Sequence, residues 1–585
     1  MAVTNGGNVA NHGTSGDTIN GTVTVDGAGS VWTNSGNFFM GTVTGTTPTI
    51  AITNGGVVNL TAGGSMQTND ATSRALITID GTGSRLSMDG TFNMQGKNPA
   101  DPTAIQVTNG GALSTYTINI GRLAGNIARI TVEGNGSSWT TTSTTNIGLQ
   151  GSGAVILTDG AEMTSGYIVV GAQEGGTGTF DVSGGARLNA INASGVRQSL
   201  NVGTGGTGTL NVNTTGTVTA GNTTIGSTVT GTGTVSVNGT DAVLNTVALT
   251  TGSNGTGTLT ITDSGVVDST GAGVIGGTTG STGVVDVSSD GQWNLINAAG
   301  AGQTLTVGSG GTGTLNINTT GTVTAGNTNI GNAATGVGTV NVDGEDAVLN
   351  TATLTTGVNG EGELTITDSG VVNSTGTGII GYAAGSAGTV TVDGANSQWN
   401  LTSVLTTGAA GTGTMALTNN ASVASYGGIV GSTGTGTGTV DVSSGGLWNA
   451  GMGALKVGDA GTGILNVNTT GTVAAGNTTI GNAAAGTGTV NVSGVNAVMN
   501  TTSLSGPEAT PVLSTASAPS TITVPSPPAA TPTTKLSAFT VPFALILSAP
   551  VPDNPTSSIS VVLSHTAPEL TLIVPWPLVD LPMIL

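Results

Sequence analysis

Apolar and polar residues alternate along short segments of this chain, and the segments recur at a nearly constant interval. In GTGTLNVNTTGTVTAGNTTIG, residues 206–226, Leu210 and Val212 alternate with Thr and Asn, which is the period of a strand with one buried face. Val218 and Ile225 mark two further short strands, each set off by Gly or Asn. A unit of about 25 residues therefore predicts three short β-strands, and no segment shows the period of a helix.

Close copies of this segment begin at Gly311 and Gly461, so the chain is built from repeats. The first inward-facing aliphatic residue of each unit recurs at intervals near 25, and two intervals lengthen to 30, at Phe180–Leu210 and Val285–Leu315. These anchor residues are Val23, Ile50, Ile77, Ile105, Ile130, Val155, Phe180, Leu210, Val235, Leu259, Val285, Leu315, Val340, Leu364, Val390, Met415, Val440, Leu465 and Val490. They predict an all-β fold, a parallel β-solenoid of about 19 coils that forms a rod of roughly 90 Å.

A large apolar residue follows the first strand in every second unit, so the full repeat spans about 50 residues. Its positions are Trp32, Leu86, Trp139, Leu188, Leu244, Trp293, Leu349, Trp399, Trp448 and Met499. Because Leu and Met replace Trp, this row indicates an internal stack that fills the solenoid rather than an exposed row for stacking on sugars.

Turns of the Asp-Gly or Asn-Gly type precede this row in many units. They are Asp26-Gly27, Asp80-Gly81, Asn238-Gly239, Asp343-Gly344 and Asp393-Gly394. We expect the Asp or Asn side chain to bond its own backbone and Gly to take a positive φ. The alternative is a calcium-binding ladder of Asp side chains, but the regular nonapeptide of calcium solenoids is absent.

Composition narrows the function. Charged residues make up 6% of the chain, its formal net charge is −20 and it has no cysteine. No basic patch is present to hold nucleic acid or an anionic membrane, and disulfides and cysteine-ligated metals are excluded. The apolar stretches near Val541–Leu547 are short and broken by proline, so no membrane insertion is expected.

Residues for catalysis are scarce. His12 and His565 lie far apart in the sequence, so they support neither a catalytic triad nor a zinc site. Paired carboxylates from successive coils remain the one enzymatic option, and Asp241 or the Glu345–Asp346 pair are the candidates. Other residues replace them in equivalent units, which favours turn positions. We therefore predict no enzyme, no catalytic residue, no metal ligand and no cofactor.

Two alternatives to a passive scaffold stay open. One is a polysaccharide-acting β-helix enzyme, which would need a groove with clustered charged residues. The other is an ice-binding solenoid, in which Thr-x-Thr patterns such as Thr217 and Thr219 would form a flat array. The outward positions, however, vary among Thr, Asn, Ser and Asp from unit to unit.

The composition changes sharply after the repeats. Residues 1–504 form the predicted solenoid, whereas 15 of the 18 prolines lie in residues 506–585. Repeated Pro opposes central strand ladders, so we expect residues 505–585 to form a Pro-rich, disordered tail. Two origins are open for it, a natural Pro-rich stalk and a frameshifted reading of the repeat gene, since a one-base shift of Gly-Thr codons encodes Ala-Pro.

The units GTVTVDGAGSVWTNSGNFFMG and GTGTLTITDSGVV resemble repeats in the passenger regions of bacterial autotransporters and related exported surface proteins, called type V secretion or PEP-CTERM-associated repeats. The resemblance spans residues 1 to about 504. It implies a right-handed parallel β-helix displayed on the cell surface, at the outer membrane or outside the cell, and linked to adhesion. A signal peptide, a translocating barrel and a sorting anchor are not recognisable, so the chain is expected to be a passenger fragment.

We therefore expect a non-enzymatic, adhesin-like rod whose partners are glycans or proteins of host or neighbouring cells. The two lengthened units carry related insertions near Ile191–Leu200 and Ile296–Leu305. Insertions into a solenoid map to its side, so these segments are the first candidates for ligand contact.

Overall fold

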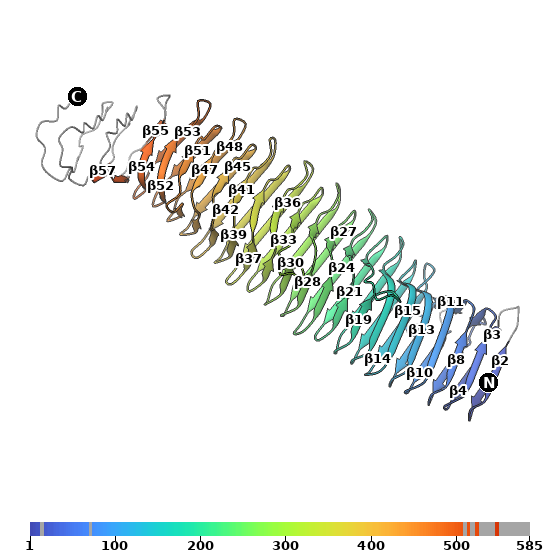
Figure 1. The fold of residues 1–585 in the computed structure, drawn as a ribbon. Helices are drawn as coiled ribbons and strands as arrows, with labels where there is room; N and C mark the ends of the chain where they lie inside the picture. Colours follow the sequence, from blue (N-terminus) through green and yellow to red (C-terminus); the bar gives the residue numbers. More distant parts are fainter. Residues whose placement is uncertain (12–16, 69–72, 507–511, 515–520, 526–543, 549–585) are drawn as a thin grey trace, which may run out of the picture. The chain divides into compact units, whose positions relative to one another are not determined.

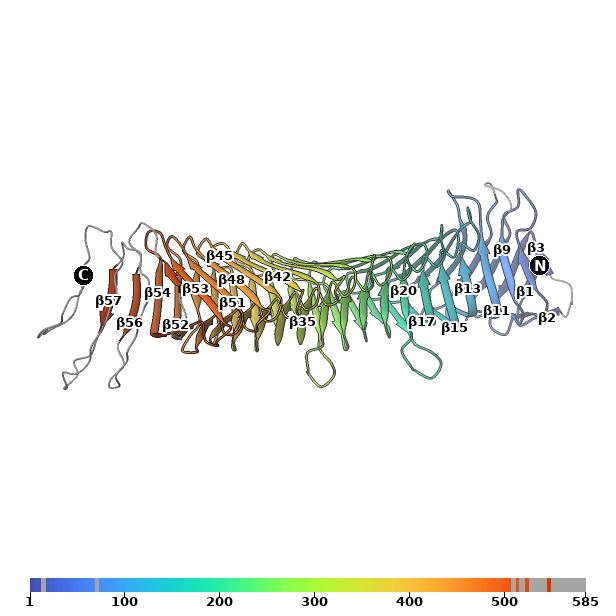
Figure 2. The same cartoon turned by 90° about the horizontal axis from the view of Figure 1, so that it is seen from above.

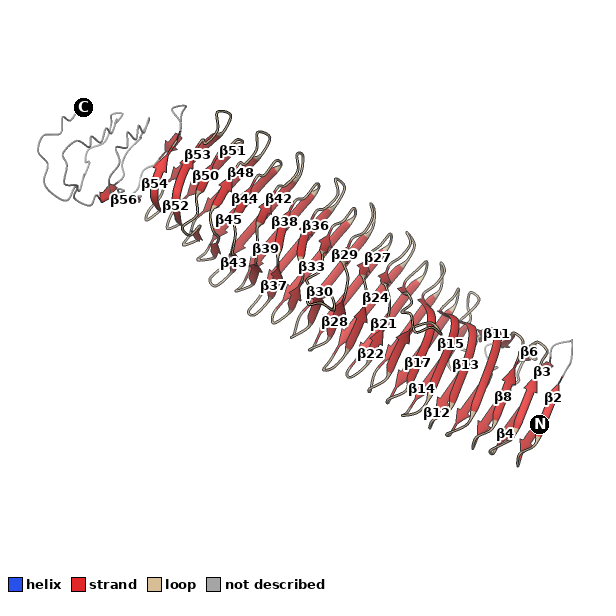
Figure 3. Ribbon diagram, viewed as in Figure 1, coloured by secondary structure: helices blue, strands red, loops and turns tan. Residues whose placement is uncertain are grey.

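The structure is a computed structural model that describes residues 1–11, 17–68, 73–506, 512–514, 521–525 and 544–548. These residues form an all-β parallel β-solenoid of about 20 turns, as the periodicity predicts. Strands and connecting loops make up the described part of the chain, with no helix in it (Figure 3). The chain divides into two compact units, unit 1 (Met1–Gln303 with Gly311–Gly313) and unit 2 (Thr304–Gly310 with Thr314–Leu585).

Each coil of unit 1 contributes a first, a second and a third strand, and equivalent strands of successive coils lie side by side (Figure 1). The first strands are β1 (Ala2–Thr4), β4 (Thr22–Asp26), β7 (Thr49–Thr53), β10 (Leu76–Asp80), β12 (Thr103–Thr108), β14 (Ile127–Glu133), β16 (Ser152–Thr158), β18 (Thr177–Val182), β21 (Thr207–Asn213), β24 (Thr232–Asn238), β27 (Thr256–Thr262) and β30 (Thr282–Val287). The second strands are β2 (Asn8–Asn11), β5 (Val31–Asn34), β8 (Val57–Leu60), β19 (Arg187–Ala190), β22 (Thr217–Thr219), β25 (Val243–Thr246), β28 (Val266–Ser269) and β31 (Gln292–Leu295). The third strands are β3 (Asp17–Ile19), β6 (Phe38–Met40), β9 (Gly64–Gln67), β20 (Leu200–Val202), β23 (Thr223–Ile225), β26 (Leu249–Thr251) and β29 (Gly273–Ile275). In four coils the second and third strands join into one, in β11 (Arg85–Gln95), β13 (Ala112–Ile120), β15 (Ser138–Ile147) and β17 (Glu162–Val170).

Unit 2 repeats this plan. Its first strands are β33 (Thr312–Asn318), which begins at the boundary, β36 (Val337–Asp343), β39 (Glu361–Thr367), β42 (Ala387–Asp393), β45 (Thr412–Thr418), β48 (Thr437–Val442), β51 (Thr462–Val467), β53 (Thr487–Val492) and β55 (Val512–Ser514). The second strands are β34 (Thr322–Thr324), β37 (Val348–Thr351), β40 (Val371–Ser374), β43 (Gln398–Leu401), β46 (Ser422–Ala424), β49 (Leu447–Asn449), β56 (Thr521–Pro525) and β57 (Ala544–Ser548). The third strands are β32 (Leu305–Val307), β35 (Asn327–Ile330), β38 (Thr353–Thr356), β41 (Gly378–Ile380), β44 (Leu405–Thr407), β47 (Gly428–Val430) and β50 (Leu455–Val457). Second and third strands are joined in β52 (Thr472–Ile480) and β54 (Val498–Ser505).

The anchor residues align as the sequence predicts. In unit 1, Val23 pairs with Ile50, Phe180 pairs with Leu210, and the register continues to Val285. In unit 2 the same row runs from Val340 to Val490. Each aliphatic side chain therefore stacks on its counterpart in the next coil, and the stack excludes water from a narrow core.

One coil precedes the first anchor. Val3 in β1 is buried and pairs with Val25, the second inward residue of β4. Met1 stands at the anchor position of this coil. It is 51% exposed, whereas the anchors from Val23 onward are buried. Because β55 also follows the last anchor, the described residues contain 21 first strands against 19 anchors.

The row of large apolar residues is internal. Trp32 is 1% exposed, and Trp139, Trp293, Trp399 and Trp448 are fully buried. Each of these Trp residues lies in register with a smaller residue of the preceding coil. Val267 is the partner of Trp293, and Val372 is the partner of Trp399. The interpretation as a filling stack is confirmed, and none of these five indoles is available to stack on a sugar ring.

The Asp-Gly turns have the predicted glycine conformation but a different role for the Asp. Gly27 and Gly81 have φ values of +94° and +90°. The Asp26 carboxylate accepts hydrogen bonds from Thr53 Oγ1 and Asn54 Nδ2 of the next coil, at 2.6 and 2.7 Å. These bonds link neighbouring coils, whereas the sequence predicted a bond to the residue's own backbone.

Most of the Pro-rich tail lies outside the described residues. Three described strands of this region continue the parallel pairing: β55 pairs with β53, β56 with β54, and β57 with β56. The predicted boundary near residue 504 and the two proposed origins of the tail stay predictions.

Candidate functional site

The two insertions form loops of one conformation in unit 1. Loop 1 (Ile191–Gln198) follows β19, and loop 2 (Ile296–Gln303) follows β31. An antiparallel bridge closes each base, between Ile191 and Arg197 in loop 1 and between Ile296 and Gly302 in loop 2. The related sequences of the insertions therefore specify a common fold.

An Asn at the second position organises each loop. Asn192 Oδ1 accepts hydrogen bonds from the backbone N–H groups of Ser194 and Val196, both at 3.0 Å. Asn297 Oδ1 accepts the equivalent bonds from Ala299 and Ala301, also at 3.0 Å. An Asn side chain that bonds its own following backbone stabilises a turn, so both loops are preorganised without help from a ligand.

The loops differ in what they present. Loop 1 exposes Val196, at 56% of its surface, and Arg197 beside it. Loop 2 has Ala301 and Gly302 at the equivalent places. Of the two loops, loop 1 alone therefore carries an exposed Val and a cation on the segment that returns to its base.

Both loops leave unit 1 on the same side (Figure 2). Each replaces the bend between the second and third strands of its coil, and four coil steps separate Phe180 from Val285, the anchors of these coils. At about 4.8 Å per coil the loops are about 19 Å apart along the stack. The part of this row of bends that runs from the coil of Ile105 to the coil of Val285 is called the loop edge, and it comprises residues 115–117, 141–144, 165–167, 190–199, 220–222, 246–248, 269–272 and 295–303.

The carboxylates singled out from the sequence lie in turns. Asp241 and Asp346 have φ values of +58° and +61°, and Glu345 stands next to Asp346 in the same exposed turn. The Glu345 backbone oxygen accepts a hydrogen bond from Thr320 N at 3.0 Å. Thr215, Thr320 and Asn496 also have positive φ at the equivalent turns of other coils. Asp241 and Asp346 therefore occupy a repeated turn position.

The sequence analysis missed another pair of carboxylates, Glu361 and Glu363. They lie on the outward face of β39 and line a shallow hollow of about 280 Å³ with Thr339 and Thr389. Side chains two residues apart on a strand are about 7 Å apart, which suits two-carboxylate chemistry. A general acid, however, needs an enclosed apolar site to stay protonated, and both glutamates are exposed in an open hollow.

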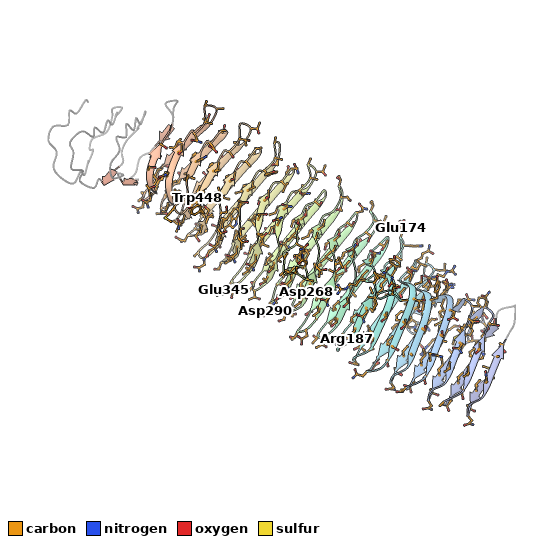
Figure 4. All side chains as sticks on the ribbon, viewed as in Figure 1. Glu174, Arg187, Asp268, Asp290, Glu345 and Trp448 are labelled. Carbon is orange, nitrogen blue, oxygen red and sulfur yellow. The ribbon has the colours of Figure 1, made fainter. Side chains whose placement is uncertain are left out.

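A larger hollow of about 510 Å³ lies at the turns that precede the first strands of unit 1. Its lining includes Asn126, Gln150, Ser152 and Glu174. Figure 4 shows Glu174 at the edge of unit 1 opposite to that of Asp290. The lining holds one carboxylate, so the arrangement lacks the paired acids of a glycosidase.

The acidic residues and the outward Thr rows bear on metal binding and on ice binding. Among the described residues no group of three or more His, Asp or Glu side chains could hold a metal ion. Outward Thr residues do align along the first strands of unit 1, with Thr177, Thr207, Thr232, Thr256 and Thr282 in one row and Thr179, Thr209, Thr234 and Thr258 in the next. The row that contains Thr217 does not form a regular Thr array, because it continues through Arg187 on one side and Val243, Val266 and Gln292 on the other. His12 and His565 lie outside the described residues.

Outward Asn side chains bond one another from coil to coil. Asn119 Nδ2 donates to Asn93 Oδ1 and Asn146 Nδ2 donates to Asn119 Oδ1, both at 2.8 Å. In unit 2, Asn491 Nδ2 donates to Asn466 Oδ1 at 2.7 Å. These ladders use part of the hydrogen-bonding capacity of the polar faces within the protein itself.

Known proteins offer limited similarity. No family model matches the chain. Over 206 residues, 35% of its length, the chain is 39% identical to an uncharacterized lipoprotein, YdeK, of Escherichia coli strain K12, and it spans 15% of the length of that protein. The described residues contain no helix long and apolar enough to cross a membrane.

A solved structure of a TibC-catalyzed hyper-glycosylated fragment of TibA, residues 55–350, aligns with 88% of this chain and with all of the fragment. The sequences are 13% identical in this alignment and the TM-score is 0.15. A TM-score this low supports no conclusion about shared structure or function.

Proposed function

We propose that this chain is a non-enzymatic scaffold, displayed on a cell surface or secreted, that acts in adhesion or cohesion. The observation that carries the proposal is the pair of loops on one side of unit 1, which share one conformation and are held by their own hydrogen bonds. Two preorganised loops on a rigid stack can contact one partner at two places, and repetition of weak contacts supplies avidity.

Two further points support a surface location. The repeat units resemble those of autotransporter passenger regions and PEP-CTERM-associated proteins, and the relative that matches part of the chain is named a lipoprotein. The partners in this proposal are glycans or proteins of host or neighbouring cells. No cofactor, metal or nucleic acid enters it.

A bead-adhesion assay tests the proposal. Beads coated with the purified full chain are added to bacterial and epithelial cells, and bound beads are counted. We expect adhesion that falls at least fivefold when residues 191–199 are replaced with Gly-Asn, the pair found at 221–222. Replacing residues 296–304 with Val-Ala, the pair at 247–248, gives the matching variant of loop 2.

Both replacements restore a bend that the chain already uses, so the stack is expected to keep its fold, which circular dichroism verifies. The control replaces Glu361 and Glu363 with Gln in the hollow of unit 2. Coated beads that adhere no better than beads coated with albumin would overturn the adhesive function. Equal adhesion of the wild type and both loop variants would remove the loops from it.

A further inference from the structure

Exposed apolar side chains of unit 1 gather on the loop edge. Among the described residues of this unit nine large apolar side chains are exposed, and five of them lie on this edge. The five are Tyr116, Tyr167, Val196, Val247 and Ile296. Concentration of exposed apolar groups along one line of an otherwise polar surface marks a contact site.

Tyr116 and Tyr167 are the two aromatic rings of this edge, and each is 51% exposed. Both lie at the bend where the second strand passes into the third, two coils apart. Thr115 pairs with Thr141, which pairs with Ser165, and Tyr167 pairs with Thr144. The two rings are therefore about 10 Å apart along the stack, with the hydroxyl groups of residues 142–144 between them.

Loop 1 lies one coil beyond Tyr167. Ile168 N donates to Ser199 O at 3.3 Å, and Ile168 pairs with Leu200, so the base of the loop adjoins the Tyr167 bend. Val196 and Arg197, both exposed, lie where loop 1 returns to this base. The two rings and the loop thus form one continuous line across four coils.

This line carries almost no charge. Arg197 is the one charged residue within the loop edge, and the exposed Asp89 lies in the bend one coil before Tyr116, in a chain with a formal net charge of −20. Asp268, next to the edge, accepts a hydrogen bond from Asn294 at 3.0 Å. A site with one cation in loop 1 and one acid beside Tyr116 has no net charge and neither attracts nor repels strongly at long range, which fits a neutral ligand.

We propose that Tyr116, Tyr167 and loop 1 bind a polysaccharide chain of neutral sugars that lies along the stack. The face of a sugar ring presents C–H groups, which suit the electron-rich face of a Tyr ring, and its hydroxyl rim suits the guanidinium of Arg197 and the hydroxyl groups of residues 142–144. A thin chain reaches both rings beside the protruding loop. A second copy of this protein would carry the same formal net charge of −20, so the two copies would repel each other at long range. This proposal rests on the adhesive function and names the ligand class of one of its sites.

The test measures binding to the full chain of maltohexaose, cellohexaose and mannohexaose, with hexagalacturonate as the acidic counterpart. The chain has four tyrosines, so 3-fluorotyrosine labelling gives few ¹⁹F resonances, which single Tyr→Phe variants assign. We expect at least one neutral oligomer to shift the Tyr116 and Tyr167 resonances. The resonance of Tyr382, which is 52% exposed in unit 2 and outside the loop edge, should stay in place.

Calorimetry then compares three variants. The double variant Y116A/Y167A should weaken binding at least tenfold, R197A about threefold, and the matched control Y382A should change it by less than twofold. All three changes are at exposed positions, and thermal unfolding verifies that the fold is kept.

Four results would overturn the proposal. They are no binding of any neutral oligomer at millimolar concentration, equal loss of binding in Y382A, binding of the galacturonate oligomer alone, and a dimer in sedimentation velocity that Y116A/Y167A abolishes. If coated beads adhere to cells while no oligomer binds, the glycan assignment fails and the adhesive function stands. If beads do not adhere, the adhesive function itself fails.

Discussion

Trp399 Nε1 donates a hydrogen bond to Ser374 Oγ of the preceding coil at 3.2 Å, deep inside unit 2. Gly378 of that same coil lies against the indole, and a Cβ built on it would be 2.7 Å from Trp399 Cζ2. A buried indole needs both a partner for its N–H and space for its ring, and the coil below supplies both.

The same arrangement recurs at other Trp coils. Trp293 donates to Ser269 and lies against Gly273, and Trp448 donates to Ser425 and lies against Gly428. From Leu244 onward, the coils that carry Leu or Met instead have Ala and Thr below them: Ala220 and Thr223 below Leu244, Ala325 and Thr328 below Leu349, and Ala475 and Thr478 below Met499. The repeats from Leu244 to Met499 thus carry one of two matched sets of residues, whereas Trp139 donates to Thr115 and has Ile118 below it.

Ser374→Ala should destabilise the protein by about 1–3 kcal/mol, because it leaves the Trp399 N–H buried without a partner. Urea unfolding, with hydrogen exchange of β40 and β43, measures the loss. The cost should shrink in a Trp399→Leu background, since Leu has no N–H to satisfy. An equal cost in both backgrounds would show that the hydrogen bond does not stabilise this pair.

Gly378→Ala should also destabilise by about 1–3 kcal/mol, because the added methyl group overlaps the indole and Leu401 Cδ2, which lies 2.5 Å from the Cβ position. Gly21→Ala is the control, since no atom lies within 4 Å of its Cβ position. Thermal unfolding of the two variants should separate them clearly. A tolerated Gly378→Ala would mean that the Trp399 ring has room to move.

Thr356→Val should stabilise the protein by about 1 kcal/mol. The Thr356 hydroxyl is fully buried without a partner, in a row with Ile330 and Ile380. Val has nearly the same shape and no polar group to desolvate. Urea unfolding checks the expected gain.

The matched control is Thr351→Val in the neighbouring strand of the same coil. The Thr351 hydroxyl donates to the Gly326 carbonyl at 2.7 Å and bonds Thr328 Oγ1 at 2.9 Å. Its removal should cost about 1–3 kcal/mol, because Thr328 then loses its partner. Opposite signs for the two Thr→Val changes are the expected result, and equal signs would contradict it.

Stability of the first coils should fall in acid. Hydrogen bonds from Thr53 and Asn54 lower the pKa of Asp26 below its ordinary value of 3.8, and those from Thr108 and Asn109 lower the pKa of Asp80 in the same way. A carboxyl group with a lowered pKa in the folded state stabilises the fold above its unfolded pKa, and the stabilisation is lost as pH falls through the folded value. The ordinary Asp pKa of 3.8 sets the upper end of this range. We therefore expect the melting temperature to drop as pH falls below about 4.

The variants D26N/D80N and T53V/T108V should both flatten this dependence, the first by removing the charge and the second by removing its main donor. Melting temperatures measured from pH 7 to pH 2 test this. A wild-type curve that falls no more steeply than those of the two variants would contradict the role of these bonds.

Most of this fold is predictable because it depends on patterns within single coils. The alternation around Leu210 and Val212 and the 25-residue spacing specify strands, coils and register, because a one-residue slip would turn every aliphatic side chain outward. The replacement of Trp by Leu and Met correctly indicated a buried row. The bond from Asp26 to Thr53 was not predictable, since it joins residues that only the stacking of coils brings together.

The candidate site was also predictable in part. The sequence located loop 1 and loop 2, because each lengthens the spacing between anchors by five residues, from 25 to 30. It did not single out Tyr116 and Tyr167, whose exposure depends on their place in the bend between two strands. The signal available was their position a few residues after the large apolar row, where the insertions also begin.

By itself, the sequence determined the repeat, the strand periodicity, the inward rows and the places where the repeat is broken, because these depend on residues close together in the chain. The tertiary structure decided which side chains meet across coils, such as Ser374 with Trp399 and Asp26 with Thr53, and it placed Tyr116 and Tyr167 two coils apart on one edge. Those meetings join residues about 25 or 50 positions apart, and they arise only when coils stack at a fixed spacing and turn equivalent bends toward the same side.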